Sequence, residues 1–293
     1  MTSIGIVSLG YSTTEALPLY HYLPGGSLLR VIVLSEPPSS ASLSGCEHFD
    51  VINDVYVPSL TGPSLKQATP QQLAELARAW DVDGIVLEGY AISHVEGFIA
   101  ELKGLGIRVG VRTNMGKAPK NADFLLLDAL GTCSEPQEVP GIEVHRLLRD
   151  LRSAGSWVEV AGYLKEPVPE RVLGLTSVTA NNEVPLHLFL LEHKGGGPVR
   201  DAYNRLRQVN PFTYVHVSLY SELTTYCPHC GSPIAYREEN VLKDLALGPS
   251  NTCWRCGYPL PFTHVVAKKT PDRVIRLSGR GTRWYDPRAV MRI

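Results

Sequence analysis

The sequence of residues 69–88 is Thr69-Pro-Gln-Gln-Leu-Ala-Glu-Leu-Ala-Arg-Ala-Trp-Asp-Val-Asp-Gly-Ile-Val-Leu-Glu88, and this stretch indicates the fold class. Thr69 is a typical N-cap, Pro70 suits the first helical position, and apolar residues recur at positions 73, 76, 77 and 80. The run from Asp83 to Glu88 is mostly apolar, as expected of a strand buried on both faces. A helix that leads directly into such a strand predicts a β/α unit of a parallel sheet.

The same alternation extends in both directions along the chain. Further strands are predicted at Ser3–Ser8, Leu29–Leu34, Ile107–Arg112, Asp123–Asp128, Trp157–Tyr163, Val172–Val178, His187–Leu191 and Tyr214–Leu219. Further helices are predicted at Ser93–Gly104, where Ser93 and Glu96 have capping-box spacing, at Ile142–Ser153 and at Pro198–Val209. Because right-handed crossovers curl successive β/α units, we expect an α/β sheet or barrel.

Two cysteine pairs follow, Cys227-Pro-His-Cys230-Gly and Cys253-Trp-Arg-Cys256-Gly. In such a zinc knuckle, two residues between the cysteines let both sulfurs reach one ion, and the next glycine permits a positive φ. Four thiolates form a closed tetrahedral site, which is typical of structural zinc. A redox dithiol is the alternative, but two pairs that are each followed by glycine favour zinc. For His229 and Trp254 we favour packing or solvent exposure at the knuckle tips, and contact with a nucleobase is the alternative.

The composition is that of an ordinary globular protein, with 44% hydrophobic and 19% charged residues. It excludes wholesale disorder and coiled coil. No apolar run is long enough to span a membrane, and the first residues have neither the basic start nor the apolar core of a signal peptide. We therefore expect a cytoplasmic protein, in which paired cysteines are metal ligands rather than disulfides.

The net charge of −1 conceals an asymmetry. Residues 264–293 hold eight basic and two acidic side chains, a balance of +6, which leaves −7 for residues 1–263. Arginine can pair with phosphate and aromatic rings can stack on bases, so this tail is a candidate nucleic-acid-binding segment. Its candidate residues are Lys268, Lys269, Arg273, Arg276, Arg280, Arg283, Trp284 and Tyr285. The alternative is that the tail folds back on the acidic body, and the sequence does not choose between the two.

In several segments the chain resembles the radical S-adenosylmethionine proteins of the AmmeMemoRadiSam type, relatives of the glycyl-radical activating enzymes. The similar segments are Pro18-Leu-Tyr-His-Tyr-Leu-Pro-Gly-Gly26, Leu73–Ala77 with Val82–Val86, Ile107–Asn114, Asp123–Asp128, Val184-Pro-Leu-His187, and Tyr214–Val217 with Thr225–Gly231. Together they span roughly residues 15–263. The resemblance implies a partial (β/α) barrel of radical SAM type, followed by a zinc ribbon.

The chain departs from this family where the family performs its chemistry. Family members hold a 4Fe–4S cluster on Cys-x3-Cys-x2-Cys, and the corresponding stretch here is Gly45-Cys46-Glu-His-Phe-Asp50-Val-Ile-Asn53. Only Cys46 is retained, and iron–sulfur clusters require thiolates or sometimes imidazoles. A Glu-Pro pair that lies near the cofactor in the family is Glu88-Gly here. We therefore expect no iron–sulfur cluster, no S-adenosylmethionine and no radical chemistry.

These observations divide the chain into a radical-SAM-like partial barrel over residues 1–223, a four-cysteine zinc ribbon over 224–263, and a basic extension over 264–293. In α/β barrels, groups at the carboxyl ends of the strands face the mouth, where ligands bind. The candidate mouth residues are Cys46, Glu88, Thr113, Asn114, Asp128 and His187. They form either a residual ligand pocket or a set of side chains that form hydrogen bonds with one another and fill the cavity. For His187 we favour the second interpretation.

The sequence leads to one principal hypothesis and two alternatives. The principal hypothesis is a pseudoenzyme, a non-catalytic zinc-containing binding or regulatory factor whose partner is RNA or a ribonucleoprotein such as the ribosome. One alternative is a cluster-free enzyme or cofactor-binding protein that uses the mouth, with Glu88, Asp128 and His187 as acid–base groups. The other alternative is a subunit of a protein complex that docks on an active relative.

Overall fold

The computed structural model describes residues 2–35, 46, 65–90, 92, 95–130, 141–165, 169–190, 196–216, 223–238, 240–266 and 282–291. Its main sheet has the strand order β15-β1-β2-β4-β5-β6-β7-β8-β9, with β3 paired to β1. The strands are β1 Ile4–Thr13, β2 Ser27–Val33, β3 Lys66–Ala68, β4 Gly84–Glu88, β5 Val109–Asn114, β6 Phe124–Ala129, β7 Trp157–Leu164, β8 Leu186–Leu190, β9 Thr213–His216 and β15 Thr282–Tyr285. Neighbours from β2 to β9 are parallel, whereas β1 runs antiparallel to β2, β3 and β15.

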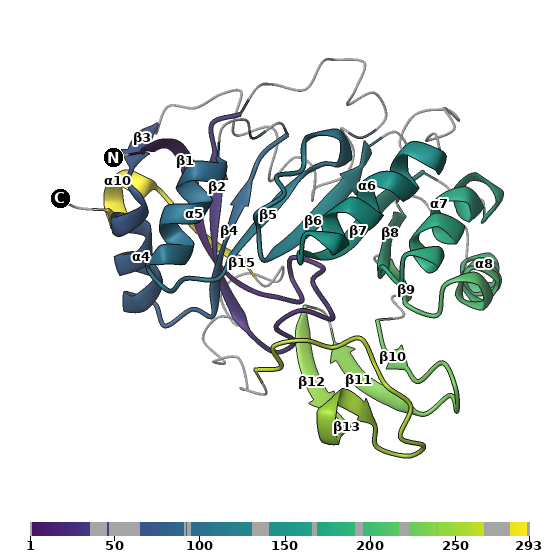
Figure 1. Cartoon of the computed structure of the whole chain (residues 1–293). Helices are drawn as coiled ribbons and strands as arrows, with labels where there is room; N and C mark the ends of the chain where they lie inside the picture. The colour runs from purple at the N-terminus through teal and green to yellow at the C-terminus, as the bar shows by residue number, and fades with distance from the viewer. Residues whose placement is uncertain are drawn as a thin grey trace.

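Helices connect most of the parallel strands. They are α4 Pro70–Ala79, α5 Glu96–Gly104, α6 Gly141–Ser153, α7 Pro169–Asn181 and α8 Gly196–Val209, and the short turn η1 Met115–Lys117 follows β5. Each parallel strand lies beside its predecessor in the chain, so crossovers of one hand place the helices on one face of the sheet. Figure 1 shows α4 to α8 along that face. The sequence-based expectation of an α/β fold with a largely parallel sheet is confirmed.

No helix within the described ranges combines the length and the apolar character that a membrane span requires.

Alternate residues along the strands supply two separate apolar cores. On the helix side, Leu87 of β4 packs in a cluster with Phe98 of α5. On the inner face of the sheet, Val86 of β4 packs in a second cluster with Leu17 and Leu19, which follow β1. The segment between β1 and β2 therefore lines the inner face, and the strands are buried on both sides as their apolar runs predicted.

The first turns of α4 and α5 differ in how they are capped. The Thr69 hydroxyl accepts a hydrogen bond from the Gln72 amide at 3.3 Å, and the Gln72 side chain accepts one from the Thr69 amide at 2.9 Å. This capping box confirms the predicted start of α4. In α5 the N-cap is Val95, without a side-chain cap, and Glu96 is the first helical residue. The predicted Ser93–Glu96 capping box therefore does not start this helix, and Ser93 lies outside the described residues.

One strand prediction is wrong, because Val172–Val178 lies within α7. Its β-branched residues favoured a strand locally, but the neighbouring strands β7 and β8 are parallel and need a crossover between them. The hydroxyls of Thr176 and Thr179 donate to the helical carbonyls of Val172 and Thr176 at 2.7 and 2.9 Å, which satisfies these polar groups inside the helix.

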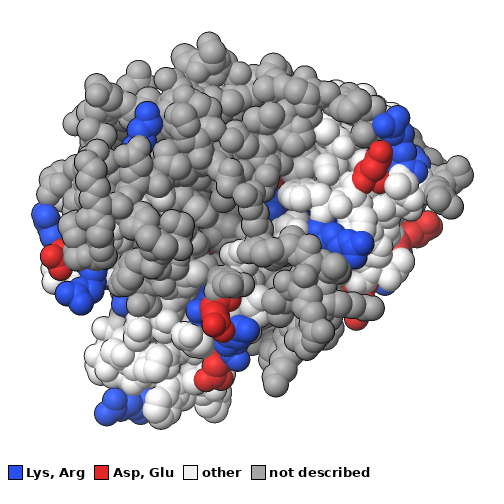
Figure 2. Space-filling view, turned by 180° about the vertical axis from the view of Figure 1, so that it is seen from behind, with Lys and Arg blue, Asp and Glu red and all other residues white. Residues whose placement is uncertain are grey.

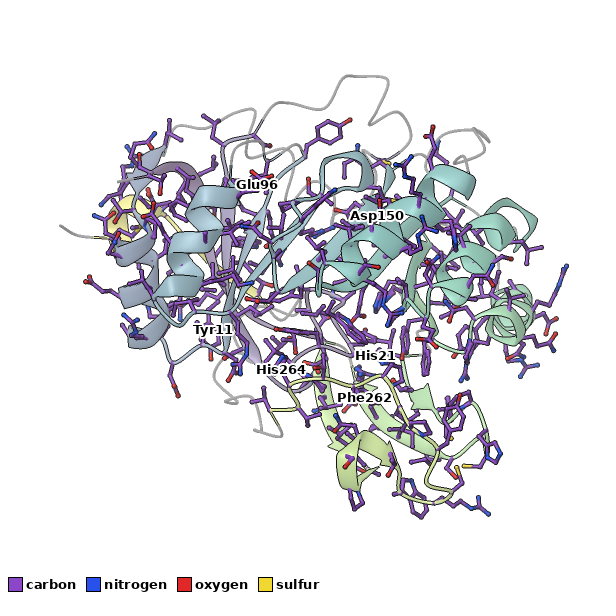
Figure 3. The ribbon with its side chains drawn as sticks, in the orientation of Figure 1. Tyr11, His21, Glu96, Asp150, Phe262 and His264 are labelled. Atoms are coloured by element: carbon purple, nitrogen blue, oxygen red, sulfur yellow. The ribbon has the colours of Figure 1, made fainter. Side chains whose placement is uncertain are left out.

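A small antiparallel region follows the barrel and lies below the sheet in Figure 1. Its strands are β10 Thr225–Tyr226, β11 Pro233–Glu238, β12 Val241–Leu245, β13 Leu247–Gly248 and β14 Thr252–Cys253, with the turn η3 Pro249–Asn251. The Thr263 amide donates to the His21 carbonyl at 2.8 Å, and the Thr263 carbonyl accepts from the Leu23 amide at 3.0 Å. The His21 ring stacks on Phe262 with centroids 4.7 Å apart, and Figure 3 shows both between the sheet and this region. We call residues 223–266 the ribbon.

The end of the chain returns to the main sheet. β15 pairs with β1 over Leu9–Ser12, and the short helix α10 Pro287–Val290 follows it. Thr282–Tyr285 of the predicted basic extension therefore form one edge of the main sheet, a position that no local sequence pattern had indicated.

Candidate functional site

The four knuckle cysteines form a single cluster. Their Sγ atoms all lie within 4.8 Å of one another. The Sγ atoms of Cys227 and Cys256 are 3.7 Å apart, as are those of Cys230 and Cys253. A tetrahedral Zn²⁺ ion with bonds of about 2.3 Å requires sulfurs about 3.8 Å apart. The cluster therefore suits a metal ion such as zinc, with four protein ligands.

Both knuckles are built on the same backbone turn. The Gly231 amide donates to the Cys227 carbonyl and the Gly257 amide to the Cys253 carbonyl, both at 2.9 Å. The two glycines have φ angles of 71° and 74°, a region that strains residues with a side chain. The amides of both leading cysteines are also bound by backbone carbonyls, at 2.8 Å. The turns thus position the sulfurs through the backbone, and the Ser232 hydroxyl adds a side-chain contact to Cys230 Sγ at 3.3 Å.

A chain of buried charges crosses the inner face of the barrel. Arg30 of β2 donates to both carboxylate oxygens of Glu88 on β4, at 2.5 and 2.6 Å. Arg112 of β5 lies 3.7 Å from Glu88 and donates twice to Asp128 of β6, at 2.9 and 3.2 Å. The Tyr163 hydroxyl donates to Asp128 at 2.5 Å. Among the residues that the structure describes, two cations therefore face two anions here, and none of the five residues named is more than 5% exposed.

Sequence reasoning found the two carboxylates of this charge chain but missed Arg30, Arg112 and Tyr163. A signal was present, because an arginine inside an apolar run such as Leu29–Val31 is buried with the strand and then needs an anion. Burial and the neighbouring Asp128 carboxylate raise the pKa of Tyr163, which keeps its hydroxyl protonated as a donor.

The remaining candidate mouth residues do not all lie together. The Thr113 hydroxyl and the Asn114 amide donate to the Tyr90 carbonyl, at 2.9 and 3.3 Å, near the end of β5. Cys46 is buried and forms a disulfide bond, so it presents no free thiolate. His187 is the second residue of β8 and therefore lies at the amino end of its strand rather than at the mouth.

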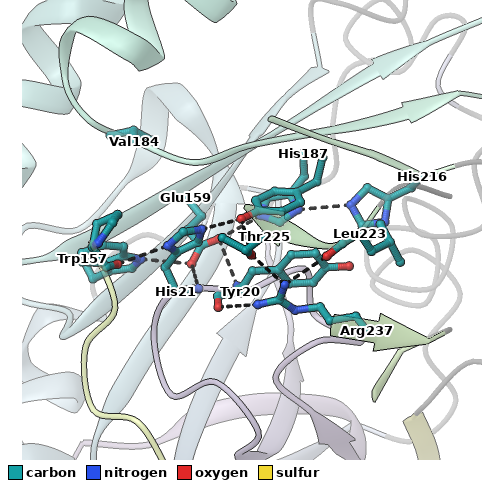
Figure 4. Close-up of polar contacts among 12 residues, drawn as sticks. Tyr20, His21, Trp157, Glu159, Val184, His187, His216, Leu223, Thr225 and Arg237 are labelled. Carbon is teal, nitrogen blue, oxygen red and sulfur yellow. Dashed lines mark hydrogen bonds and ion pairs between the residues drawn. The ribbon is translucent and has the colours of Figure 1, made fainter. Parts of the chain in front are cut away.

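His187 belongs to a second polar network, at the amino ends of the strands (Figure 4). Its centre is Glu159 of β7, which accepts from the backbone amides of Tyr20 and His21 at 3.0 and 2.9 Å. Glu159 also accepts from the Trp157 indole at 3.0 Å and from His187 Nε2 at 2.8 Å. Four donors on two oxygens suit a carboxylate. Glu159 thus holds the segment between β1 and β2 against the barrel.

A directed series of hydrogen bonds joins this network to the ribbon. The Pro261 carbonyl can only accept, so His21 Nδ1 donates to it at 3.2 Å, and Nε2 then accepts from the Tyr214 hydroxyl at 2.6 Å. The Tyr214 oxygen accepts from Thr225 at 2.7 Å, and the Thr225 oxygen accepts from Arg237 at 2.9 Å. Barrel and ribbon therefore share one buried polar interface.

The imidazoles of this interface are held neutral. Burial lowers the pKa of His21 to about 3, although Glu159 opposes the shift. Burial and the Arg237 charge lower the pKa of His187 well below its usual value. The pKa of His216, whose Nε2 lies 3.1 Å from His187 Nδ1, shifts in the same direction, again through burial. Neutral rings, each with one donor and one acceptor, match the hydrogen-bond directions derived above.

Acidification is expected to destabilise the fold from about pH 6.5 downward. The unfolded chain protonates its histidines near a pKa of 6.5, whereas folded His21 takes up a proton only near pH 3. Each pH unit in this window should remove about 1.4 kcal/mol through His21, and His187 and His216, whose pKa values are also lowered by burial, should add to this loss. Burial raises the pKa of Glu15, which offsets part of this loss. Urea titrations spaced through the window measure the slope.

Two variants separate this interface from other histidines. His187→Gln retains a donor for Glu159 and should reduce the pH slope, because one of the histidines with a lowered pKa is gone. His229→Gln, at an exposed knuckle position outside this interface, is the matched control. Equal free energies of unfolding at neutral and acidic pH would contradict the assignment of neutral buried imidazoles.

The described part of the basic extension packs against the body. Trp284 lies against Arg30, whose guanidinium is 4.7 Å from the indole ring. The Tyr285 ring is 5.0 Å from that of Trp80, and the Arg283 guanidinium lies 5.0 Å from the Tyr285 ring. For these three residues the packing corresponds to the folded-back alternative. The other candidate nucleic-acid-binding residues, Lys268, Lys269, Arg273, Arg276 and Arg280, lie outside the described residues.

Comparison with the models of known protein families gives no match, and comparison with curated proteins gives none either. The structure supports a largely parallel α/β sheet followed by a four-cysteine cluster. The resemblance to radical S-adenosylmethionine proteins therefore rests on the sequence segments quoted above.

Proposed function

We propose that this chain is a zinc-containing, non-catalytic binding factor on an inactivated radical-SAM-like barrel, and that its partner is RNA or a ribonucleoprotein. The observation that carries the proposal is the paired state of the inner-face carboxylates. Glu88 and Asp128, the acid–base candidates, each accept two hydrogen bonds from one arginine. Carboxylates held in this way cross-link the strands, and their oxygens are occupied by arginine donors. The third candidate, His187, is buried and neutral at the other end of the barrel.

The cluster-binding stretch supports the same conclusion. Cys46 is the one cysteine retained from the family's motif, and it forms a disulfide bond. The other two motif positions hold Asp50 and Asn53, whose oxygen and amide groups are poor ligands for an iron–sulfur cluster. The motif therefore retains no free thiolate to hold the cluster that radical chemistry requires.

The choice of RNA rests on the charge distribution and on the ribbon. The sequence from Lys268 to Arg280 concentrates positive charge in an otherwise acidic protein, which favours a polyanionic partner. Zinc ribbons with arginine-rich extensions are frequent in proteins that bind RNA, which supports this choice by analogy.

Co-sedimentation with total RNA and with ribosomal particles tests the proposal. We expect the protein to move with the RNA at low salt and to be released as salt rises, because each neutralised phosphate releases counterions. A plot of log K against log salt has a negative slope. The double variant Lys268→Gln/Lys269→Gln should make this slope shallower by about 1.4, or about 0.7 for each phosphate that is no longer neutralised. A protein that stays in the low-molecular-weight fraction at low salt would contradict the proposal.

A further inference from the structure

The tips of the two knuckles form an exposed surface that none of the roles above uses. We define the knuckle face as His229, Trp254, Arg255 and Tyr258. Trp254 is 55% and Tyr258 is 40% exposed, and the other two side chains are exposed as well. Large aromatic side chains left in solvent on one knuckle, as Trp254 and Tyr258 are, are typical of an interaction site.

The aromatic rings of the knuckle face are held in place. The Trp254 indole donates to the Pro233 carbonyl at 3.1 Å. The His229 and Tyr258 rings are nearly parallel, with an interplanar angle of 9° and centroids 5.8 Å apart. Both knuckles are also braced by the backbone turns at the metal site. A flat ligand that stacks here therefore loses little side-chain entropy from the protein.

The charge of the knuckle face selects among flat ligands. Between Cys227 and Pro233 and between Cys253 and Pro259, Arg255 is the one charged side chain besides the cysteines, and there is no acid. In Figure 2 the lower lobe of the molecule is largely white, with basic atoms at its tip and with acidic and basic atoms together along one side. Four thiolates around Zn²⁺ carry a net negative charge, so this face is poorly suited to binding many phosphates. Ring faces with one arginine suit unpaired bases instead.

We propose that the knuckle face binds single-stranded RNA, with bases stacked on Trp254 and on the His229–Tyr258 pair and Arg255 touching the strand between them. This inference rests on the proposed function, because it assigns base recognition to the ribbon and leaves most phosphate binding to the basic segment. The two surfaces therefore differ in their dependence on salt. Removal of a stacking ring lowers the affinity equally at every salt concentration. Removal of a lysine makes the slope of log K against log salt shallower.

Titration of the zinc-loaded full chain into fluorescent oligouridine, at several salt concentrations, tests this division. Trp254→Ala should weaken binding about tenfold with an unchanged salt slope, while Trp254→Phe, which keeps a ring, should retain most of the affinity. Tyr236→Ala is the matched control. Tyr236 is 51% exposed on the same ribbon but lies opposite Asp244, and its removal should change the affinity by less than about twofold. An unchanged zinc content shows that each variant is folded.

The outcomes separate this inference from the proposed function. If the unaltered chain binds neither oligouridine nor total RNA at low salt, both fail. If the unaltered chain binds RNA and Trp254→Ala binds it equally well, the assignment of base stacking to the knuckle face is wrong and the proposed function stands. Binding of an RNA duplex as tightly as of oligouridine would contradict base stacking. Loss of a protein partner with Trp254→Ala, without any change in oligouridine binding, would assign the face to a protein.

Discussion

Cys253→Ser is expected to abolish zinc binding and to unfold the ribbon. The ribbon core is small, with Ile234, Leu260 and Phe262 as its main buried apolar side chains. Structural zinc contributes about 10–16 kcal/mol of apparent binding free energy in zinc-finger peptides, which exceeds what a core of this size supplies. Metal analysis should find about one zinc per chain before the substitution and none after it. Removal of zinc by a chelator should have the same effect on ellipticity and on Tm.

The loss should extend into the barrel, because the ribbon supplies Arg237 and Thr225 to the buried interface. Hydrogen exchange should increase at the amino ends of β8 and β9 in Cys253→Ser. His229→Ala, which leaves all four ligands in place, is the matched control and should keep its zinc. A Cys253→Ser protein with full zinc content and unchanged Tm would overturn the assignment of the metal centre.

The same metal analysis bears on the inactive barrel. After anaerobic incubation with iron and sulfide, we expect zinc alone and no iron–sulfur absorption in the visible spectrum. A cluster signal that is accompanied by cleavage of S-adenosylmethionine would reverse the proposed loss of radical chemistry.

Glu88→Gln is expected to destabilise the chain by about 3–5 kcal/mol, because it removes the carboxylate charge that faces the buried guanidinium groups of Arg30 and Arg112. The substitution keeps the shape of the side chain, so the loss measures charge rather than packing. Urea unfolding at neutral pH gives the difference in free energy, and the slope m should be unchanged.

A double variant tests the charge balance. Arg30→Met/Glu88→Leu removes one cation and one anion together and should recover part of the loss, since apolar replacements of buried ion pairs are often tolerated. Asp150→Asn is the surface control, because it breaks an ion pair between Asp150 and Arg146, whose side chains are 43% and 78% exposed, respectively. This substitution should lower the free energy of unfolding by less than about 1 kcal/mol. A Glu88→Gln protein as stable as the parent would contradict the role of the charge chain in holding the strands.

Features whose causes lie within about twenty residues could be predicted from the amino-acid sequence. The cap of α4 depends on Thr69, Pro70 and Gln72, which are neighbours in the chain. The knuckle turns likewise depend on a cysteine pair and the glycine that follows, so spacing was enough to predict four converging sulfurs. Apolar runs identified most parallel strands, because burial on both faces leaves a direct mark on composition.

Which side chains meet across the sheet could be learned from the tertiary structure alone. Glu88 and Arg30 are paired because β2 and β4 are neighbours in a particular register, and one residue of slip would turn either side chain to the opposite face. His187 was expected at the mouth, yet its place at the start of β8 puts it beside Glu159 and the ribbon. β15 joins β1 from the far end of the chain. Pairings of this kind depend on packing between distant segments, and no local periodicity or propensity encodes them.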